Sequence, residues 1–271
     1  ISAMFDFEWI NVNIFGRLYQ RTRSFFDNSD LSASGRPATA HEKALLAKWP
    51  GAVRADIMNG TYKVPVSDGT GRDRAPARFA LGLLKQAGFR LENGRLVDGR
   101  SGKPFGFELL VSDREQERLA LLYAQSLRRI GVSVDVRQVD QVQYQRRRQK
   151  FDFDMIMGWW IASNSPGNEQ RNRWSSTSAD IESSFNLAGA KSPAIDGLIG
   201  KMLGAQLRDD FETAVRAYDR VLQSGFYIVP LFHKPDIWIT HSNKLAFPRP
   251  LPRYASPLFS ETLETWWRKS P

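Results

Sequence analysis

The sequence predicts an α/β fold, and three observations carry that prediction. Between residues 105 and 160, alternating apolar residues typical of strands take turns with the three-and-four spacing of amphipathic helices. The order strand, helix, strand, helix, strand is that of a sheet with helical crossovers. With 271 residues, 42% of them hydrophobic, the chain is long enough to bury a core. It holds no apolar run of about 18 residues that would span a bilayer.

The first hundred residues are predicted to be mostly helix and loop. Residues 1–15 begin at once with apolar and aromatic side chains, as a helix entered in its middle would. Residues 19–29 lack a clean period and predict a surface loop, and 41–49 predict a short helix. Asp73 precedes a proline and a one-sided apolar series, which predicts a helix that stops at Gly88.

The central segment has the clearest periodicity. In residues 105–111 apolar side chains alternate with others, which predicts a mostly buried strand. In residues 118–130 apolar side chains recur at intervals of three and four residues, which predicts a helix. Valines alternate with polar residues over 132–136, which predicts a second strand. Asp140 is placed to cap a short basic helix, and residues 151–160 predict a third strand.

The last third is predicted to add two helices, one strand and a tail. Ser192 begins one helix, and Asp209 with a glutamate three residues on has the capping-box pattern that opens another. Residues 227–232 predict a strong apolar strand. Five prolines within 235–257 then predict an extended tail that needs a partner surface.

Composition excludes several kinds of site. The chain has no cysteine, which removes disulfides, thiolate zinc sites, iron–sulfur clusters and cysteine nucleophiles. His41, His233 and His241 are far apart without a second ligand at helical spacing, so no metal site is predicted. Neither a G-x-S-x-G elbow nor a P-loop occurs. The residues predict no enzyme and no cofactor; a hydrolase with its catalytic residues in another part of a longer protein stays open.

The chain is basic, with 38 Lys+Arg against 29 Asp+Glu and a formal charge of +9. The cluster of Arg146, Arg147, Arg148 and Lys150 is of the kind that meets phosphates, so a nucleic-acid-binding domain is the alternative function. A nucleic-acid site gathers its arginines on one face, whereas here they are spread along the whole chain. Solvated helix faces explain that spread, and no nucleic-acid partner is expected.

The end of the third predicted strand is the candidate binding site. In open α/β sheets ligands bind beyond the carboxyl ends of strands, and here a buried strand runs out into small polar residues. Trp159 and Trp160 point to opposite sides of a strand, so one of them is free to line a cleft, unless it packs under a loop. The polar candidates that follow are Ser163, Asn164, Asn168 and Glu169.

Five short segments occur in a recognisable order. They are 80–89 (ALGLLKQAGF), 98–104 (DGRSGKP), 130–134 (IGVSV), 151–155 (FDFDM) and 165–169 (SPGNE). In that order they resemble the oligopeptide-type extracellular solute-binding proteins of bacterial ABC importers. Residues 5–11 (FDFEWIN) and 19–26 (YQRTRSFF) resemble, more narrowly, the branch associated with oligopeptide and microcin C uptake. The resemblance covers nearly the whole chain.

The resemblance implies a lobe of the type II periplasmic-binding-protein kind, with a mixed sheet, flanking helices and an extended C-terminal return segment. Members of the family are two-lobed, so residues 1–232 would be the second lobe and 233–271 the segment that returns to the first. The implied function is the substrate-binding component of an ABC transporter. It would capture peptides or peptide-like solutes in the periplasm and deliver them to the permease subunits, after export by a signal peptide upstream of these residues.

The resemblance also assigns roles to site residues. Dipeptide and oligopeptide binders pair the free α-amino group of the ligand with an aspartate three residues after the tryptophan at this strand end. By that spacing Trp160 places Ser163 there, and a hydroxyl gives no charge-assisted bond to an ammonium. Recognition of a free N-terminus is therefore not expected unless Glu169 replaces the aspartate. Arg147 and Arg21 resemble positions kept in the narrower branch; they either meet a ligand carboxylate or phosphate or are lobe-surface arginines.

Overall fold

The computed structural model describes residues 1–160, 163–249 and 264–269. The α-helices are α1 Phe7–Asn13, α2 Ala40–Leu46, α3 Ala55–Met58, α4 Ala75–Gln86, α5 Arg114–Arg128, α6 Gln141–Gln149, α7 Glu169–Trp174, α8 Pro193–Leu203 and α9 Arg208–Gly225, with short 3₁₀ helices at Ser2–Met4 and Ser176–Ser178. The strands are β1 Gln20–Arg21, β2 Phe89–Glu92, β3 Arg95–Asp98, β4 Gly106–Val111, β5 Ser133–Gln138, β6 Met155–Ile156, β7 Phe232–His233, β8 Leu245–Ala246 and β9 Trp267–Arg268.

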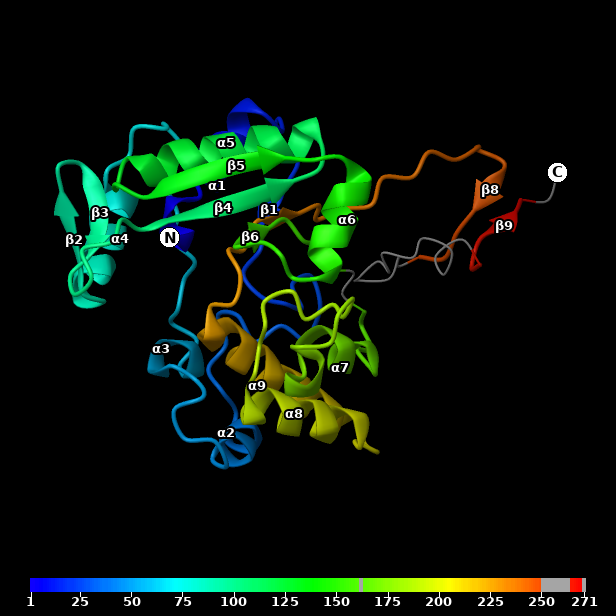
Figure 1. Cartoon of the computed structure of the whole chain (residues 1–271). Coiled ribbons are helices and arrows are strands. Elements are labelled where there is room, and N and C mark those ends of the chain that lie inside the picture. The colour runs from blue at the N-terminus through cyan, green and yellow to red at the C-terminus, as the bar shows by residue number, and fades with distance from the viewer. Residues whose placement is uncertain (161–162, 250–263, 270–271) are drawn as a thin grey trace.

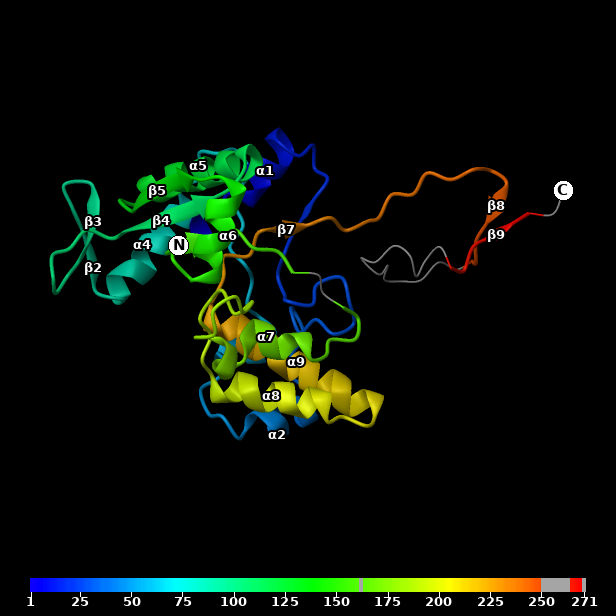
Figure 2. The same ribbon diagram turned by 45° about the vertical axis from the view of Figure 1, so that its right-hand side comes forward.

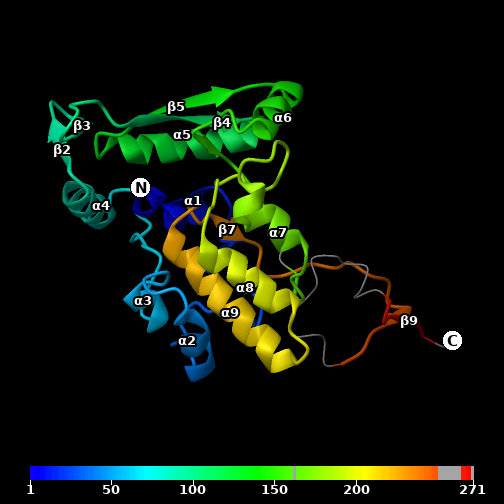
Figure 3. The ribbon, with the colours of Figure 1, turned by 60° about the horizontal axis from the view of Figure 1, so that its bottom comes forward.

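These elements form two parts, one above the other in Figure 1 and again in Figure 3. The upper one, here the sheet part, holds the strands β2 to β6 with α4, α5 and α6. The lower one, here the helical part, holds α2, α3, α7, α8 and α9. Each part has its own hydrophobic core, one centred on β4 and α5 and the other on α8 and α9. The chain passes between the two parts several times, so neither is a continuous segment.

The sheet is three-stranded and parallel, in the order β5-β4-β6. Helix α5 connects β4 to β5 and α6 connects β5 to β6, as the periodicity predicts. Helix α6 begins at the predicted cap, since Asp140 accepts the N–H groups of Val142 and Gln143. Helix α5 begins at a cap of the same kind, where Asp113 accepts the N–H groups of Glu115 and Gln116. The α/β prediction for this segment is confirmed.

The third strand is much shorter than the predicted 151–160. Only Met155–Ile156 pairs with β4. Phe151 has a positive φ of 55°, which turns the chain before the strand begins. The side chain of Asp154 accepts the Glu108 N–H at 2.9 Å, so the ladder does not continue toward the start of β4.

A β-hairpin projects from the sheet part at the left of Figure 1. Asn93 and Gly94 both have positive φ, as a type I′ turn requires, and they join β2 to β3. Gly131 is needed where this hairpin meets the end of α5. A Cβ there would lie 2.6 Å from the Leu91 side chain and 2.7 Å from the Leu96 nitrogen, so a larger residue does not fit.

Three sequence-based predictions are wrong in detail. Residues 1–15 are not one helix, because α1 begins at its own cap, where Asp6 accepts the Trp9 N–H. Asp209 does not cap α9; that helix starts at Arg208 after Leu207, which has no side-chain cap. Residues 227–232 are not a strand either, since only Phe232 and His233 pair, with β1.

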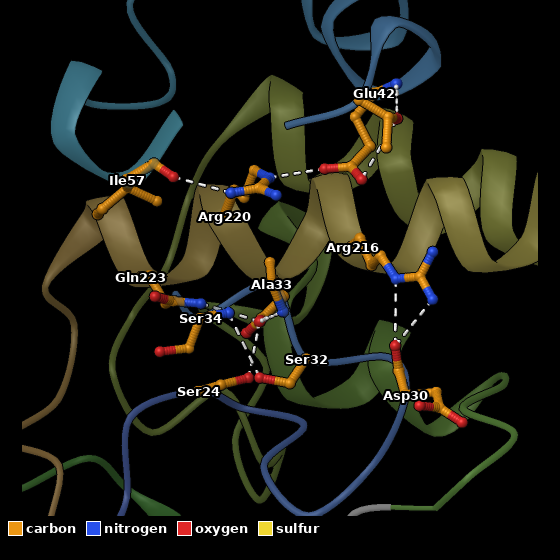
Figure 4. A network of polar contacts seen from close by, with 12 residues as sticks. Ser24, Asp30, Ser32, Ala33, Ser34, Glu42, Ile57, Arg216, Arg220 and Gln223 are labelled. Carbon is orange, nitrogen blue, oxygen red and sulfur yellow. Dashed lines mark hydrogen bonds and ion pairs between the residues drawn. The ribbon is translucent and has the colours of Figure 1, made fainter. Parts of the chain in front are cut away.

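Buried polar contacts fix residues 24–58 onto α9 (Figure 4). Asp219 accepts hydrogen bonds from Ser24 Oγ (2.7 Å) and from the backbone N–H of Phe25 (3.0 Å) and Ala33 (2.8 Å). One turn along α9, Arg216 donates to the Asp30 carbonyl. The segment predicted as a surface loop over 19–29 is therefore anchored to a helix about 190 residues away in sequence.

The C-terminal segment runs away from both parts after His233 (Figures 1 and 2). Residues of β8 and β9 pair as a small antiparallel ribbon. Three of the five tail prolines fall within 250–263 and lie outside the described residues. No helix in the described ranges combines the length and apolarity needed to cross a membrane.

Candidate functional site

A cleft of about 1460 Å³ opens between the sheet part and the helical part. Its walls come from β6 and the residues after it, from the turn at 22–29, from α7 and from residues 226–238. The carboxyl end of β6 thus leads directly into the cleft, which is where ligands bind in open α/β folds. Tyr144 of α6 donates to the Met157 carbonyl at 3.0 Å and holds this exit in place.

The two adjacent tryptophans have different surroundings. Trp160 lies against Trp174 of α7, with ring centroids 5.5 Å apart, and packs on the core of the helical part. Trp159 lines the cleft and is 81% exposed. An exposed indole in a cleft has its whole face available to a ligand.

The polar candidates are divided between the cleft and its rim. Ser163 and Asn164 line the cleft and are exposed, whereas Asn168 and Glu169 lie outside the lining residues. Glu169 is occupied, since its carboxylate accepts the Gly167 N–H and the Gln170 side-chain amide. Burial acts to raise the pKa of Glu169, but these hydrogen bonds bring it below its usual value.

The two candidate arginines also lie outside the lining residues. Arg147 pairs with Glu108 at 2.8 Å and with Asp152 at 2.9 Å, which fixes the end of α6 to β4. Arg21 of β1 is buried over the ring of Phe5 and donates to the Phe5 carbonyl at 3.0 Å. Burial lowers the pKa of Arg21 to about 10. The structure does not bring these side chains together with Trp159.

Asp27 and His233 line the cleft and were not candidates from the sequence. Pairing of β1 with β7 places His233 beside the start of the turn that carries Asp27, because Gln20 lies opposite His233 and Thr22 Oγ1 is 3.1 Å from His233 Nδ1. Strands of two residues leave no periodic signal, so no local pattern links the two positions. Among the described residues, no group of three or more His, Cys, Asp or Glu side chains is arranged to hold a metal ion.

Residues 1–181 match the family described as "Bacterial extracellular solute-binding proteins, family 5 Middle". The chain belongs to this family. The resemblance seen in the sequence is confirmed, and family and fold point to a solute-binding role for this family 5 chain.

Individual relatives agree with the family. Over 270 residues the chain is 48% identical to a putative binding protein of Brucella suis biovar 1, covering 100% of this chain and 43% of the relative. It is 42% identical over 267 residues to the peptidoglycan-binding protein YepA of Agrobacterium fabrum, covering 98% of this chain and 42% of YepA. The chain therefore spans less than half the length of these curated relatives.

Solved structures share the fold. The oligopeptide-binding protein AppA from Bacillus subtilis, in complex with a nonapeptide, superposes with a TM-score of 0.63 at 17% identity. The match covers 99% of this family 5 chain and 46% of AppA. The predicted periplasmic-binding-protein-like fold class is confirmed.

Proposed function

We propose that this chain is the second lobe of a two-lobed receptor, the substrate-binding component of an ABC transporter. The receptor captures peptides or peptide-like solutes in the periplasm and delivers them to the membrane permease. Residues 1–232 form the lobe and 233–271 return to the first lobe. The length of the relatives supports this organisation, as does a C-terminal segment that extends away from both parts of the lobe.

The cleft is the observation that carries the proposal. It is large enough for several amino-acid residues and presents an exposed indole beside hydroxyl and amide groups. Apolar walls with a few polar groups suit solutes whose backbone needs hydrogen bonds and whose side chains vary. Closure of the first lobe over the cleft by hinge motion would exclude water from the ligand.

Ligand contacts are assigned to the side chains that follow β6. Trp159 supplies the apolar wall, Trp160 supports it from the core, and Ser163 and Asn164 provide hydrogen bonds. Two relatives, named as a peptidoglycan-binding protein and a probable peptide-binding protein, support a ligand with peptide character. Membership of a solute-binding family supports a binding role without catalysis.

Ligand identification tests this function. The protein with both lobes is purified under mild conditions, and any retained solute is identified by mass spectrometry. Peptides or peptide-containing solutes are expected. Calorimetry with a mixed peptide pool then compares this protein with the 271-residue chain, which lacks half of the cleft and is expected to bind weakly or not at all. Failure of the two-lobed protein to bind any peptide would overturn the proposal.

A substitution locates the site. Trp159→Ala in the two-lobed protein is expected to weaken peptide binding at least tenfold, because large aromatic side chains dominate binding energies. Phe79→Ala is the control, since Phe79 is also exposed but lies on α4 outside the cleft. Its effect is expected to stay within about twofold, well below the tenfold step of about 1.4 kcal/mol.

A further inference from the structure

We propose that Asp27 and His233 form a cation subsite of the cleft that binds a primary ammonium group of the ligand. The inference rests on the proposed function and names one chemical feature of the solute. The ammonium is either a free N-terminus or a lysine-type side chain, since both present the same three N–H donors.

The fold brings the two side chains to one wall of the cleft. Besides the contact of Thr22 with His233, the Thr22 N–H donates to the Leu231 carbonyl at 3.3 Å, which continues the β1–β7 ribbon. The chain then turns so that Asp27 Oδ2 accepts the Arg23 N–H at 2.5 Å. Asp27, Thr22 and His233 all line the cleft.

The charge of the neighbouring Arg23 acts on Asp27, but the two side chains form no ion pair in the described part of the chain. The side chain of Asp27 is held there by backbone N–H groups, and no salt bridge to it is found. Burial raises the pKa of Asp27, against the opposing effects of the Arg23 N–H, of the charges of His233 and Arg23, and of the Ser24 N–H. Burial likewise lowers the pKa of His233, which favours an uncharged imidazole near neutral pH. A ligand ammonium would complete this site with a charge-assisted hydrogen bond.

The other carboxylates that line the described cleft are less suited. Asp154 is exposed and already accepts the Glu108 N–H. Asp180 is 79% exposed in its side chain and pairs with Lys191 at 2.6 Å. Asp236 is exposed on the extended segment. Exposed carboxylates gain little from pairing because water screens them.

The turn that carries Asp27 is held from behind. Ser24 and Phe25, three and two residues earlier, donate to Asp219 in the core, as the Ser24 contact in Figure 4 shows. A subsite on an anchored turn loses little freedom when it binds, which favours affinity.

Three peptide probes test the subsite by calorimetry with the two-lobed protein. They are Ala-Ala-Ala with a free N-terminus, N-acetyl-Ala-Ala-Ala, and N-acetyl-Ala-Lys-Ala. Asp27→Asn keeps the size of the side chain and is expected to weaken at least one amine-containing probe tenfold or more. Binding of N-acetyl-Ala-Ala-Ala should change less than threefold, which also shows that the variant is folded. The probe that weakens identifies the source of the ammonium.

Asp236→Asn is the matched control, because it removes the same charge from an exposed position on the same cleft. It is expected to change every affinity less than threefold. Equal effects of Asp27→Asn on all three probes, or an equal effect of Asp236→Asn, would overturn the subsite and leave the proposed function intact. If the unmodified protein binds the mixed peptide pool but none of the three probes, the subsite is overturned and the proposed function stands. If it binds no peptide at all, both are overturned.

Discussion

Arg220 of α9 donates from Nε to Glu42 of α2 at 2.6 Å in the core of the helical part, with side chains that are 1% and 2% exposed. Arg220 also donates to the Ile57 carbonyl at 2.8 Å, so a single guanidinium ties both α2 and α3 to α9. Figure 4 shows these contacts. The pair is a structural ion pair of the fold, distant from the cleft lining.

Removing one partner of this pair is expected to be costly. Glu42→Gln leaves a buried charge without its counterion, which typically costs about 3–5 kcal/mol of unfolding free energy. Urea denaturation measures the loss. The double variant Glu42→Leu/Arg220→Met removes both charges and is expected to recover most of the stability. Arg208→Ala, which breaks a pair with Glu212 at an 81% exposed side chain, should cost only about 0.5 kcal/mol. A double variant less stable than Glu42→Gln would contradict the expectation.

Two glycines of α8 are expected to respond in opposite directions to alanine. A Cβ on Gly197 would lie 2.2 Å from the Trp49 ring, so Gly197→Ala forces α8 away from the segment after α2 and should cost about 1–3 kcal/mol. Gly200 has no atom within 4 Å of such a Cβ. Gly200→Ala should therefore stabilise the protein by up to about 1 kcal/mol through helix propensity. Thermal and urea unfolding measure the change in stability of both variants. Equal changes would show that Trp49 moves aside freely.

Asp219 makes stability depend on pH. Burial raises its pKa to about 6 in the folded protein, against the hydrogen bonds from Ala33, Ser24 and Phe25, while the ordinary value is 3.8. Between these values the folded state binds more protons than the unfolded state, so the contribution of Asp219 is full below pH 3.8 and is lost as pH rises through about 6.

The variant Asp219→Asn isolates this contribution. It does not titrate, so the stability of the unmodified protein relative to the variant should fall between pH 4 and 7 by up to about 3 kcal/mol. Urea midpoints at four pH values give the difference, and the other titrating groups cancel because both proteins carry them. A difference that rises with pH would mean that the hydrogen bonds outweigh burial.

Local sequence patterns were sufficient to predict the main elements of the sheet part. Residues 105–150 carry their periodicity within one or two turns, and Asp140 acts as the helix start that the sequence indicates, while α5 begins four residues before the predicted 118, after Asp113, a cap that was not predicted. Where a contact between residues distant in sequence sets the bounds of an element or the burial of a side chain, local patterns do not predict it. The third strand starts later than predicted because the Asp154 side chain takes the Glu108 N–H, a partner 46 positions away. Asp219 and Arg220 have the spacing of ordinary helix polar residues, although both are fully buried.

In the candidate site, too, some residues are placed by local sequence and others by long-range pairing. Trp159, Ser163 and Asn164 follow a strand in sequence, so their place at the cleft is a local consequence of where β6 ends. Asp27 and His233 come together only through a ribbon of two-residue strands. Their residue types alone gave no reason to connect them, because neither a carboxylate in a loop nor a single histidine indicates a site.

Ser163 offers a test of the ligand end-group that the family position accepts. It is exposed on the cleft wall and has no charge, so Ser163→Asp places a carboxylate where related binders are expected to hold an ammonium. In the two-lobed protein this variant should raise the affinity ratio of Ala-Ala-Ala over N-acetyl-Ala-Ala-Ala at least tenfold, about 1.4 kcal/mol. Ser165→Asp is the control, because Ser165 lies on the same loop but outside the cleft lining. An equal rise of this affinity ratio in Ser165→Asp would show that the added carboxylate attracts the ammonium only at long range and that Ser163 is not at the binding position. If the unmodified protein already prefers the free amine tenfold and Asp27→Asn abolishes that preference, the N-terminus binds at Asp27 and the assignment of Ser163 to the ammonium position is wrong.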